Sequence, residues 1–135
     1  MSAPSFMRQE IAGIPDAVAT FLDRSSSSVA RAGALLRRKD PALIATVARG
    51  SSDHAANYLK YAAELSAGIP VASLGPSIAS IFGARLRLGR AACIAISQSG
   101  KSPDIVKMAE TAGQGGALTI ALTNTASSPL AAPCH

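Results

Sequence analysis

An apolar run of strand length, Ala91 to Ile96, is followed at once by a turn rich in hydroxyl groups, residues 97–102, and then by the start of a helix. Ser102 stands at the capping position, Pro103 at the first helical position and Asp104 in the first turn. The pattern predicts a buried strand, a tight polar turn and a helix N-terminus in direct succession. Free backbone N–H groups and the positive end of the helix dipole meet at such a turn. We therefore expect the turn to bind an anion, and a phosphate in particular.

Short apolar segments alternate with helical patterns along the rest of the chain. The segments expected to form strands are Ala42 to Ala48, Val71 to Leu74, Ala91 to Ile96 and Ala117 to Leu122. This alternation predicts an α/β fold, with an open parallel sheet of about four strands, right-handed crossovers and flanking helices. The residues before the first strand are helical in pattern. We expect residues 1–40 to form an N-terminal helical segment and residues 41–135 to form the α/β domain.

Two of the expected helices can be described further. In the N-terminal segment, apolar residues recur at helical spacing, but the stretch from Gly13 to Pro15 predicts an interruption. A second helix is expected to run to about Ala67, with Ser51 or Ser52 as its N-cap. The residues expected on its buried face are Tyr58, Leu59, Ala62, Ala63 and Leu65.

Serines also follow the first expected strand, in the stretch Gly50-Ser51-Ser52. Serine at a helix start is a common cap, so these residues alone indicate no more than a helix N-terminus. The first and third strands, however, would end at the same edge of a parallel sheet, where open α/β sheets bind ligands. We therefore expect the two polar turns to share one ligand site.

The end of the turn, Gly100-Lys101-Ser102, also matches the end of a P-loop, in which glycine-rich backbone cradles nucleotide phosphates. The first glycine of that motif is missing, because Ala95 stands at its position inside the apolar run. No later strand ends in the aspartate that would hold magnesium. A P-loop nucleotide-binding protein is therefore a remote alternative.

Composition and charge limit the classes of function that this chain can have. The chain has 13 Lys and Arg residues against 8 Asp and Glu, a formal charge of +5. The positive residues fall mainly in two small groups, 37–39 and 85–90, without interleaved aromatic residues, which favours solvated surface over nucleic-acid binding. Cys93 and Cys134 lack metal-ligand spacing to a histidine, so we expect neither a disulfide nor a metal. No apolar stretch approaches the length of a membrane span. These features indicate a soluble, cytoplasmic protein.

Three motifs resemble those of SIS (sugar isomerase) domains and occur in the same order. They are A-R-G-S-S-D-H-A-A-N-Y from Ala48 to Tyr58, S-Q-S-G-K-S-P-D from Ser97 to Asp104, and the turn from Thr123 to Ala131. The chain looks most like the isomerase part of glucosamine-6-phosphate synthase, and like related deaminases and isomerases that lack a glutaminase domain. The resemblance implies a flavodoxin-like three-layer fold. It also implies a phosphate site at Ser97, Gln98, Ser99 and Ser102 and a sugar site at Gly50, Ser51 and Ser52.

The resemblance further implies a role in hexose or hexosamine phosphate chemistry. The ligand would be fructose 6-phosphate or glucosamine 6-phosphate, without a cofactor, and the reaction isomerisation, deamination or amination. The catalytic residues of such isomerases lie in a second SIS half, so we expect none in this chain; His54 and Glu64 lack the geometry of a general base. We interpret the chain as an N-terminal half that stops before the fifth strand and associates with a second copy or a second half. A non-catalytic sugar-phosphate sensor is the alternative.

Overall fold

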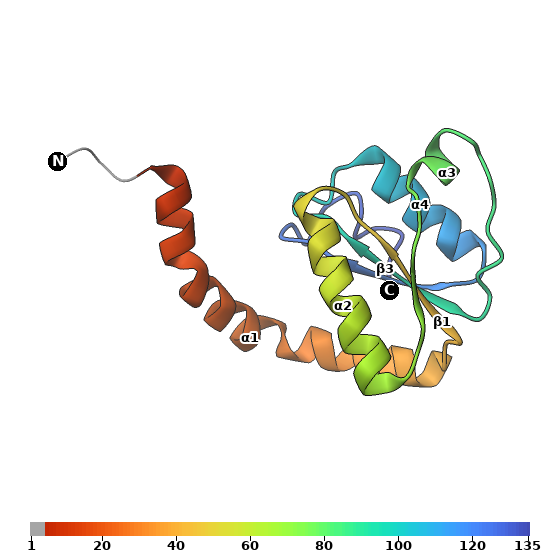
Figure 1. Ribbon diagram of the computed structural model, residues 1–135, viewed down its shortest axis with the longest axis horizontal. Coiled ribbons are helices and arrows are strands. Elements are labelled where there is room, and N and C mark those ends of the chain that lie inside the picture. Colours follow the sequence, from red (N-terminus) through yellow and green to blue (C-terminus); the bar gives the residue numbers. More distant parts are fainter. Residues whose placement is uncertain (1–4) are drawn as a thin grey trace. The chain divides into compact units, whose positions relative to one another are not determined.

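The computed structural model describes residues 5–135 and contains two compact units, one ending at Ala34 and the other formed by Leu35–His135. Figure 1 shows the elements in chain order. The helices are α1 (Phe6–Lys39), α2 (Ser51–Ala67), α3 (Ser77–Ser80) and α4 (Pro103–Gln114). The strands are β1 (Leu43–Val47), β2 (Val71–Ser73), β3 (Ala91–Ile96) and β4 (Leu118–Leu122). Each expected strand is therefore present, within one residue at either end.

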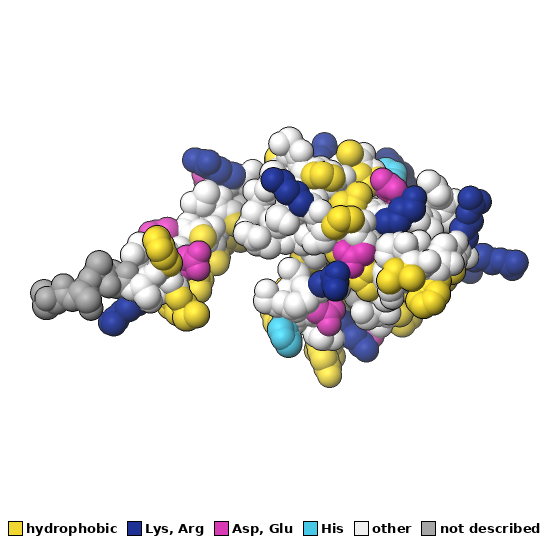
Figure 2. All heavy atoms as spheres, turned by 90° about the horizontal axis from the view of Figure 1, so that it is seen from above, with side chains coloured by type: hydrophobic (Ala, Val, Ile, Leu, Met, Phe, Trp, Pro, Cys, Tyr) yellow, Lys and Arg dark blue, Asp and Glu magenta, His cyan; other side chains and the backbone are white. Residues whose placement is uncertain are grey.

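Helix α1 is continuous, so the interruption expected between Gly13 and Pro15 was wrong. Proline inside a helix removes one N–H donor and leaves the carbonyl four residues earlier without its partner. The residues around Pro15 are exposed, so water can satisfy the carbonyl of Ile11 and the helix passes through. Figure 2 shows hydrophobic side chains on the surface of this helix; Ile11 and Val18, one heptad apart, are 59% and 50% exposed. Within the described residues, no helix is both long and apolar enough to cross a membrane.

The four strands form one parallel sheet in the order β2-β1-β3-β4. The two central strands, β1 and β3, pair along their whole length, from Leu43 with Ala91 to Val47 with Ala95. Nearly every residue of these two strands is buried, as expected for a parallel sheet that is covered on both faces. The α/β fold with about four parallel strands and flanking helices is confirmed.

Alternate residues of the central strands enter two separate cores. Ala45 and Cys93 belong to the larger core, which includes the fully buried Ile105 and Met108 of α4. Ile44 and Ile94 belong to a smaller core, against which α2 packs. Successive side chains of a strand point to opposite faces, so α2 covers one face of the sheet and α4 the other, as Figure 1 shows.

Helix α2 departs from the sequence expectation in two ways. Its N-cap is Gly50, with no side-chain capping bond, so neither Ser51 nor Ser52 caps the helix. Its expected buried face was partly wrong, because Tyr58 and Leu65 are 79% and 85% exposed. The residues that meet the smaller core are Leu59 and Ala63, with Ala56 buried one turn earlier. Helical periodicity defined two apolar stripes here, and the sheet covers only one of them.

Candidate functional site

The two expected ligand turns lie at the point where the chain reverses direction across the sheet. From β1 the chain moves outward to β2, and it returns through β3 to reach β4 on the other side. The carboxyl ends of β1 and β3 are therefore neighbours, and the connections that leave them diverge. Crevices at such switch points are the usual ligand sites of open parallel sheets.

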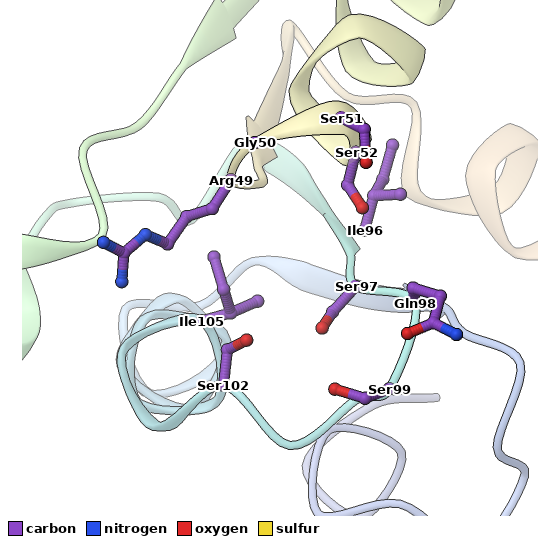
Figure 3. A pocket seen from close by; sticks show the side chains of 10 residues that line it. All are labelled: Arg49, Gly50, Ser51, Ser52, Ile96, Ser97, Gln98, Ser99, Ser102 and Ile105. Carbon is purple, nitrogen blue, oxygen red and sulfur yellow. The ribbon is translucent and has the colours of Figure 1, made fainter. Parts of the chain in front are cut away.

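A cavity of ≈ 260 Å³ opens between these two turns. It is lined by all seven residues predicted from the sequence, together with Arg49, Ile96 and Ile105. The seven are Gly50, Ser51, Ser52, Ser97, Gln98, Ser99 and Ser102. In Figure 3 the hydroxyl groups of Ser97, Ser99 and Ser102 point toward a common centre, with Ser51 and Ser52 across the cavity. The structure thus brings the predicted phosphate and sugar residues into one site.

Two of the serine hydroxyls are oriented by the turn's own backbone. The N–H of Gly100 donates to Ser97 Oγ at 3.2 Å, and the N–H of Lys101 donates to Ser99 Oγ at 3.3 Å. Each hydroxyl oxygen accepts a hydrogen bond from a backbone N–H, which leaves the hydroxyl's own hydrogen free to donate to a ligand. Ser97 is buried with 7% exposure, so its hydroxyl position is also fixed by packing. This arrangement is suited to an acceptor such as a phosphate oxygen.

Two helix N-termini meet at the cavity. Helix α2 begins after Gly50, whose positive φ of 58°, with a ψ of −133°, is a backbone conformation that glycine adopts far more readily than other residues. Helix α4 begins after Ser102, with Pro103 in its first turn, and the Ser102 side chain makes no capping bond. The Ser102 hydroxyl is therefore not used by its own helix. Both N-termini direct positive dipole ends toward the same space, which favours an anion. In the first turn of α4, however, Pro103 has no N–H and the Ile105 N–H donates to Asp104 Oδ1 at 3.0 Å.

The end of β4 and the segment that follows it support the turn formed by residues 97–102 from behind. Ser97 N–H donates to Leu122 O at 3.0 Å, Asn124 N–H to Gln98 O at 3.1 Å, and Leu130 N–H to Gly100 O at 3.0 Å. These bonds fix the backbone of the turn at three positions. The motif from Thr123 to Ala131 thus has a structural role, which the sequence alone could not assign.

Ser128 is a further residue to which the sequence alone assigned no role. It is 4% exposed, and its Oγ has no hydrogen-bond partner within the described chain. The side chain lies against Gly100, which is in the left-handed conformation with φ 63°. A β-carbon on residue 100 would lie 2.5 Å from the Ser128 β-carbon and 2.8 Å from Thr123 Oγ1. Position 100 therefore requires glycine for both conformation and space.

The remaining titratable candidates lie outside the cavity lining. His54 and Lys101 are exposed, and neither lines the site. Glu64 has a structural partner, because its Oε1 accepts the Val71 N–H at 3.0 Å. Among the described residues, no group of three or more His, Cys, Asp or Glu side chains could hold a metal ion. The only thiol at the sheet centre, Cys93, is fully buried, and burial raises its pKa to about 12.

Comparison with protein-family models matches residues 35–135 to the SIS domain. The chain belongs to the SIS domain family. The structure does not favour the P-loop alternative. Ala95 stands where a P-loop has its first glycine, and it lies inside strand β3 of the SIS domain instead of in a loop. No curated protein matches the chain significantly.

Several solved structures are similar to this SIS domain, and their names refer to sugars or sugar phosphates. A provisionally assigned phosphosugar isomerase from Silicibacter pomeroyi DSS-3 is 62% identical, with a TM-score of 0.92 over 95% of this chain. The match covers 39% of that isomerase, so the chain spans about two fifths of its length.

Two further structures share the fold at lower identity. The C-terminal domain of glucosamine-fructose-6-phosphate aminotransferase from Francisella tularensis is 22% identical, with a TM-score of 0.79 over 96% of this chain and 37% of that one. The sugar isomerase domain of an RpiR transcription factor from Sphaerobacter thermophilus is 23% identical, with a TM-score of 0.76 over 97% of this chain and 73% of that one.

Proposed function

We propose that this SIS domain binds a hexose or hexosamine 6-phosphate and forms the N-terminal, phosphate-binding half of an isomerase or deaminase. One observation carries the proposal: three serine hydroxyls and two helix N-termini converge on a cavity whose described lining includes no carboxylate. A dianionic phosphate meets hydroxyl, amide and arginine donors there and no negatively charged side chain of that lining. Similarity to a provisionally assigned phosphosugar isomerase supports the assignment.

The proposed ligand would occupy the cavity in a defined direction. Its phosphate would accept hydrogen bonds from Ser97, Ser99 and Ser102 with Gln98 beside it, and its sugar would extend toward Gly50, Ser51 and Ser52. Binding energy gained at the phosphate then holds the sugar carbons in place for chemistry elsewhere on the molecule. The groups that would transfer protons are expected in a second SIS half. We therefore expect this chain alone to bind sugar phosphates weakly and to turn over none.

A sensor function is the second candidate, favoured by the likeness to the sugar isomerase domain of a transcription factor. Both functions need the same phosphate site, so binding alone does not separate them. They differ in what happens when a second SIS half from a related isomerase is supplied. Isomerisation of fructose 6-phosphate or deamination of glucosamine 6-phosphate by the mixture supports the enzyme, and ligand-dependent binding without turnover supports the sensor.

A thermal-unfolding titration tests the proposed site. We expect glucosamine 6-phosphate and fructose 6-phosphate to raise the melting temperature more than inorganic phosphate or ATP with magnesium does. At a hundred times Kd, a ligand that binds only the folded state adds about 2.7 kcal/mol of stability. The double variant Ser97→Ala/Ser99→Ala should lose this response.

Ser66→Ala/Ser80→Ala is the matched control. The Ser66 hydroxyl donates to the Ala62 carbonyl within α2 and the Ser80 hydroxyl to the carbonyl of Pro76, the residue before α3; none of these residues lines the cavity. The control should keep the wild-type response. An equal response in all three proteins would move the ligand to another site, and no response in the wild type would remove the proposed function.

A further inference from the structure

The cavity has one charged residue in its described lining, Arg49. The other polar groups there are hydroxyls, one amide and backbone N–H groups, all of them neutral. A phosphate dianion gains most from a cationic donor, because the attraction of opposite charges adds to the hydrogen bond and the arginine fork can bind two phosphate oxygens. The position of Arg49 therefore matters for any phosphorylated ligand.

Arg49 is held at the edge of the cavity by an ion pair. Its Nη1 donates to Asp104 Oδ2 at 2.6 Å, and the two side chains are 67% and 19% exposed. Asp104 lies in the first turn of α4, where the helix dipole stabilises a carboxylate. Arg49 belongs to the first ligand turn and Asp104 follows the second, so the pair links the two turns. The better-fixed member of the pair is Asp104.

The guanidinium has donors to spare. It carries five N–H groups in a planar fork and makes one hydrogen bond within the described chain. Figure 3 shows the Arg49 side chain at the end of the cavity away from Gln98, extending out from Gly50. In Figure 3 the guanidinium points away from the serine hydroxyls, so contact with a ligand bound among them requires this side chain, which is 67% exposed, to change its rotamer.

We propose that Arg49 is the charged residue that binds the ligand's phosphate, with Asp104 as its positioning residue. The inference rests on the proposed function and adds to it, because none of the seven residues predicted from the sequence carries a charge. Asp104 holds one edge of the guanidinium, and the bound phosphate accepts hydrogen bonds from the other. The ion pair thereby closes the site on the side opposite Gln98.

Binding of inorganic phosphate and of glucosamine 6-phosphate to a series of variants tests the inference. Arg49→Gln should weaken both ligands by about tenfold to a hundredfold, as expected for loss of a charge-assisted bond. Arg49→Lys keeps the charge without the fork and should fall between wild type and Arg49→Gln. Arg85→Gln removes one exposed positive charge outside the cavity and controls for net charge.

The charge-swapped variant Arg49→Asp/Asp104→Arg separates a ligand-binding role from a purely structural one. It restores an ion pair between the two turns but leaves an anion at position 49. We expect its melting temperature to fall below the wild type, because a cation at position 104 meets the positive end of the α4 dipole and the Asp104 bond to the Ile105 N–H is lost. We expect its phosphate affinity to stay as low as that of Arg49→Gln. Asp104→Asn should lose less affinity than Arg49→Gln, because the cation remains.

Three results would overturn the inference while leaving the proposed function intact. They are wild-type affinity in Arg49→Gln, wild-type affinity in the charge-swapped variant, and a loss in Arg49→Gln that is confined to glucosamine 6-phosphate and spares inorganic phosphate. Wild-type protein that binds neither ligand would overturn the proposed function itself, and this inference with it.

Discussion

The Ser128 side chain lies directly behind Gly100, in the space that a β-carbon on residue 100 would need. The two residues are 28 positions apart, and backbone hydrogen bonds between their segments hold them in contact, including Leu130 N–H to Gly100 O at 3.0 Å. Gly100 is also the residue whose N–H orients the Ser97 hydroxyl. The contact therefore couples the segment after β4 to the geometry of the turn formed by residues 97–102.

Gly100→Ala should destabilise the protein and weaken phosphate binding. The left-handed conformation costs an alanine about 1–2 kcal/mol, and the clash with Ser128 and Thr123 adds about 1–3 kcal/mol. Gly83→Ala is the matched control, because Gly83 has φ 62° and open space around its missing β-carbon. Urea unfolding should show a distinctly larger loss for Gly100→Ala. Adding Ser128→Gly to Gly100→Ala should recover part of that excess, and equal losses at positions 83 and 100 would refute the steric argument.

Much of the site could be predicted from the sequence because its signals are local. Ser97 to Ser102 stand between an apolar strand and a helix start, and parallel strands place such turns at one edge of the sheet. The contact of Arg49 with Asp104 spans 55 residues, and no local pattern marks it. No local pattern marks the packing of Ser128 against Gly100 either, because the path of the chain after β4 determines that contact.

The incorrect predictions also have physical causes. Periodicity shows that α2 has apolar positions, but only the packing against Ile44 and Ile94 decides which stripe is buried. Serine next to a helix start predicts a cap, yet Gly50, with its positive φ, starts α2 without a side-chain bond. In α1 the exposed surroundings of Pro15 let the helix continue.

Ser102→Ala should separate ligand binding from stability. An N-cap serine that bonds to its helix usually contributes about 0.5–2 kcal/mol, but Ser102 makes no capping bond. We expect the free energy of unfolding to change by less than about 0.5 kcal/mol, because no such bond is lost. Phosphate affinity should fall about tenfold to a hundredfold, the effect of losing one hydrogen bond to a charged acceptor. A large loss of stability with unchanged affinity would mean that the hydroxyl serves the helix instead of the ligand.

Glu64 is expected to stabilise the fold without taking part in binding. Its carboxylate accepts the N–H of Val71, which is 7% exposed and begins the edge strand β2. Glu64→Ala leaves that donor unpaired and should cost about 1–3 kcal/mol of unfolding free energy, whereas Glu64→Gln keeps an acceptor and should cost less. Chemical denaturation gives both values. Reduced sugar-phosphate affinity in the well-folded Glu64→Gln variant would argue for a functional role.

The exposed stripe of α2 is expected to mediate self-association. Tyr58, Tyr61 and Leu65 lie on one side of the helix at helical spacing and are 79%, 67% and 85% exposed. Contiguous apolar surface of this kind favours contact with a second protein surface. Sedimentation velocity should show concentration-dependent dimers, reduced in Tyr61→Lys/Leu65→Glu. Ile81→Lys, which changes an exposed apolar residue just after α3, is the control. Dimers that persist in the α2 variant and vanish in the control would place the contact near α3.

Stability should fall as pH rises from about 9 to about 12, and Cys93 should account for part of the loss. Burial, with a smaller contribution from Cys134, raises the pKa of Cys93 from its ordinary 9.0 to about 12. Between these values the unfolded thiol ionises while the native thiol keeps its proton, so the unfolded state binds fewer protons and gains stability relative to the native state. The stabilising contribution is therefore complete below pH 9 and is lost as pH rises toward 12. Unfolding free energies of the wild type and Cys93→Ala, measured across this range, isolate the thiol from lysine and tyrosine titration. The difference between the two proteins should shrink with pH, and a constant difference would show that Cys93 ionises equally in both states.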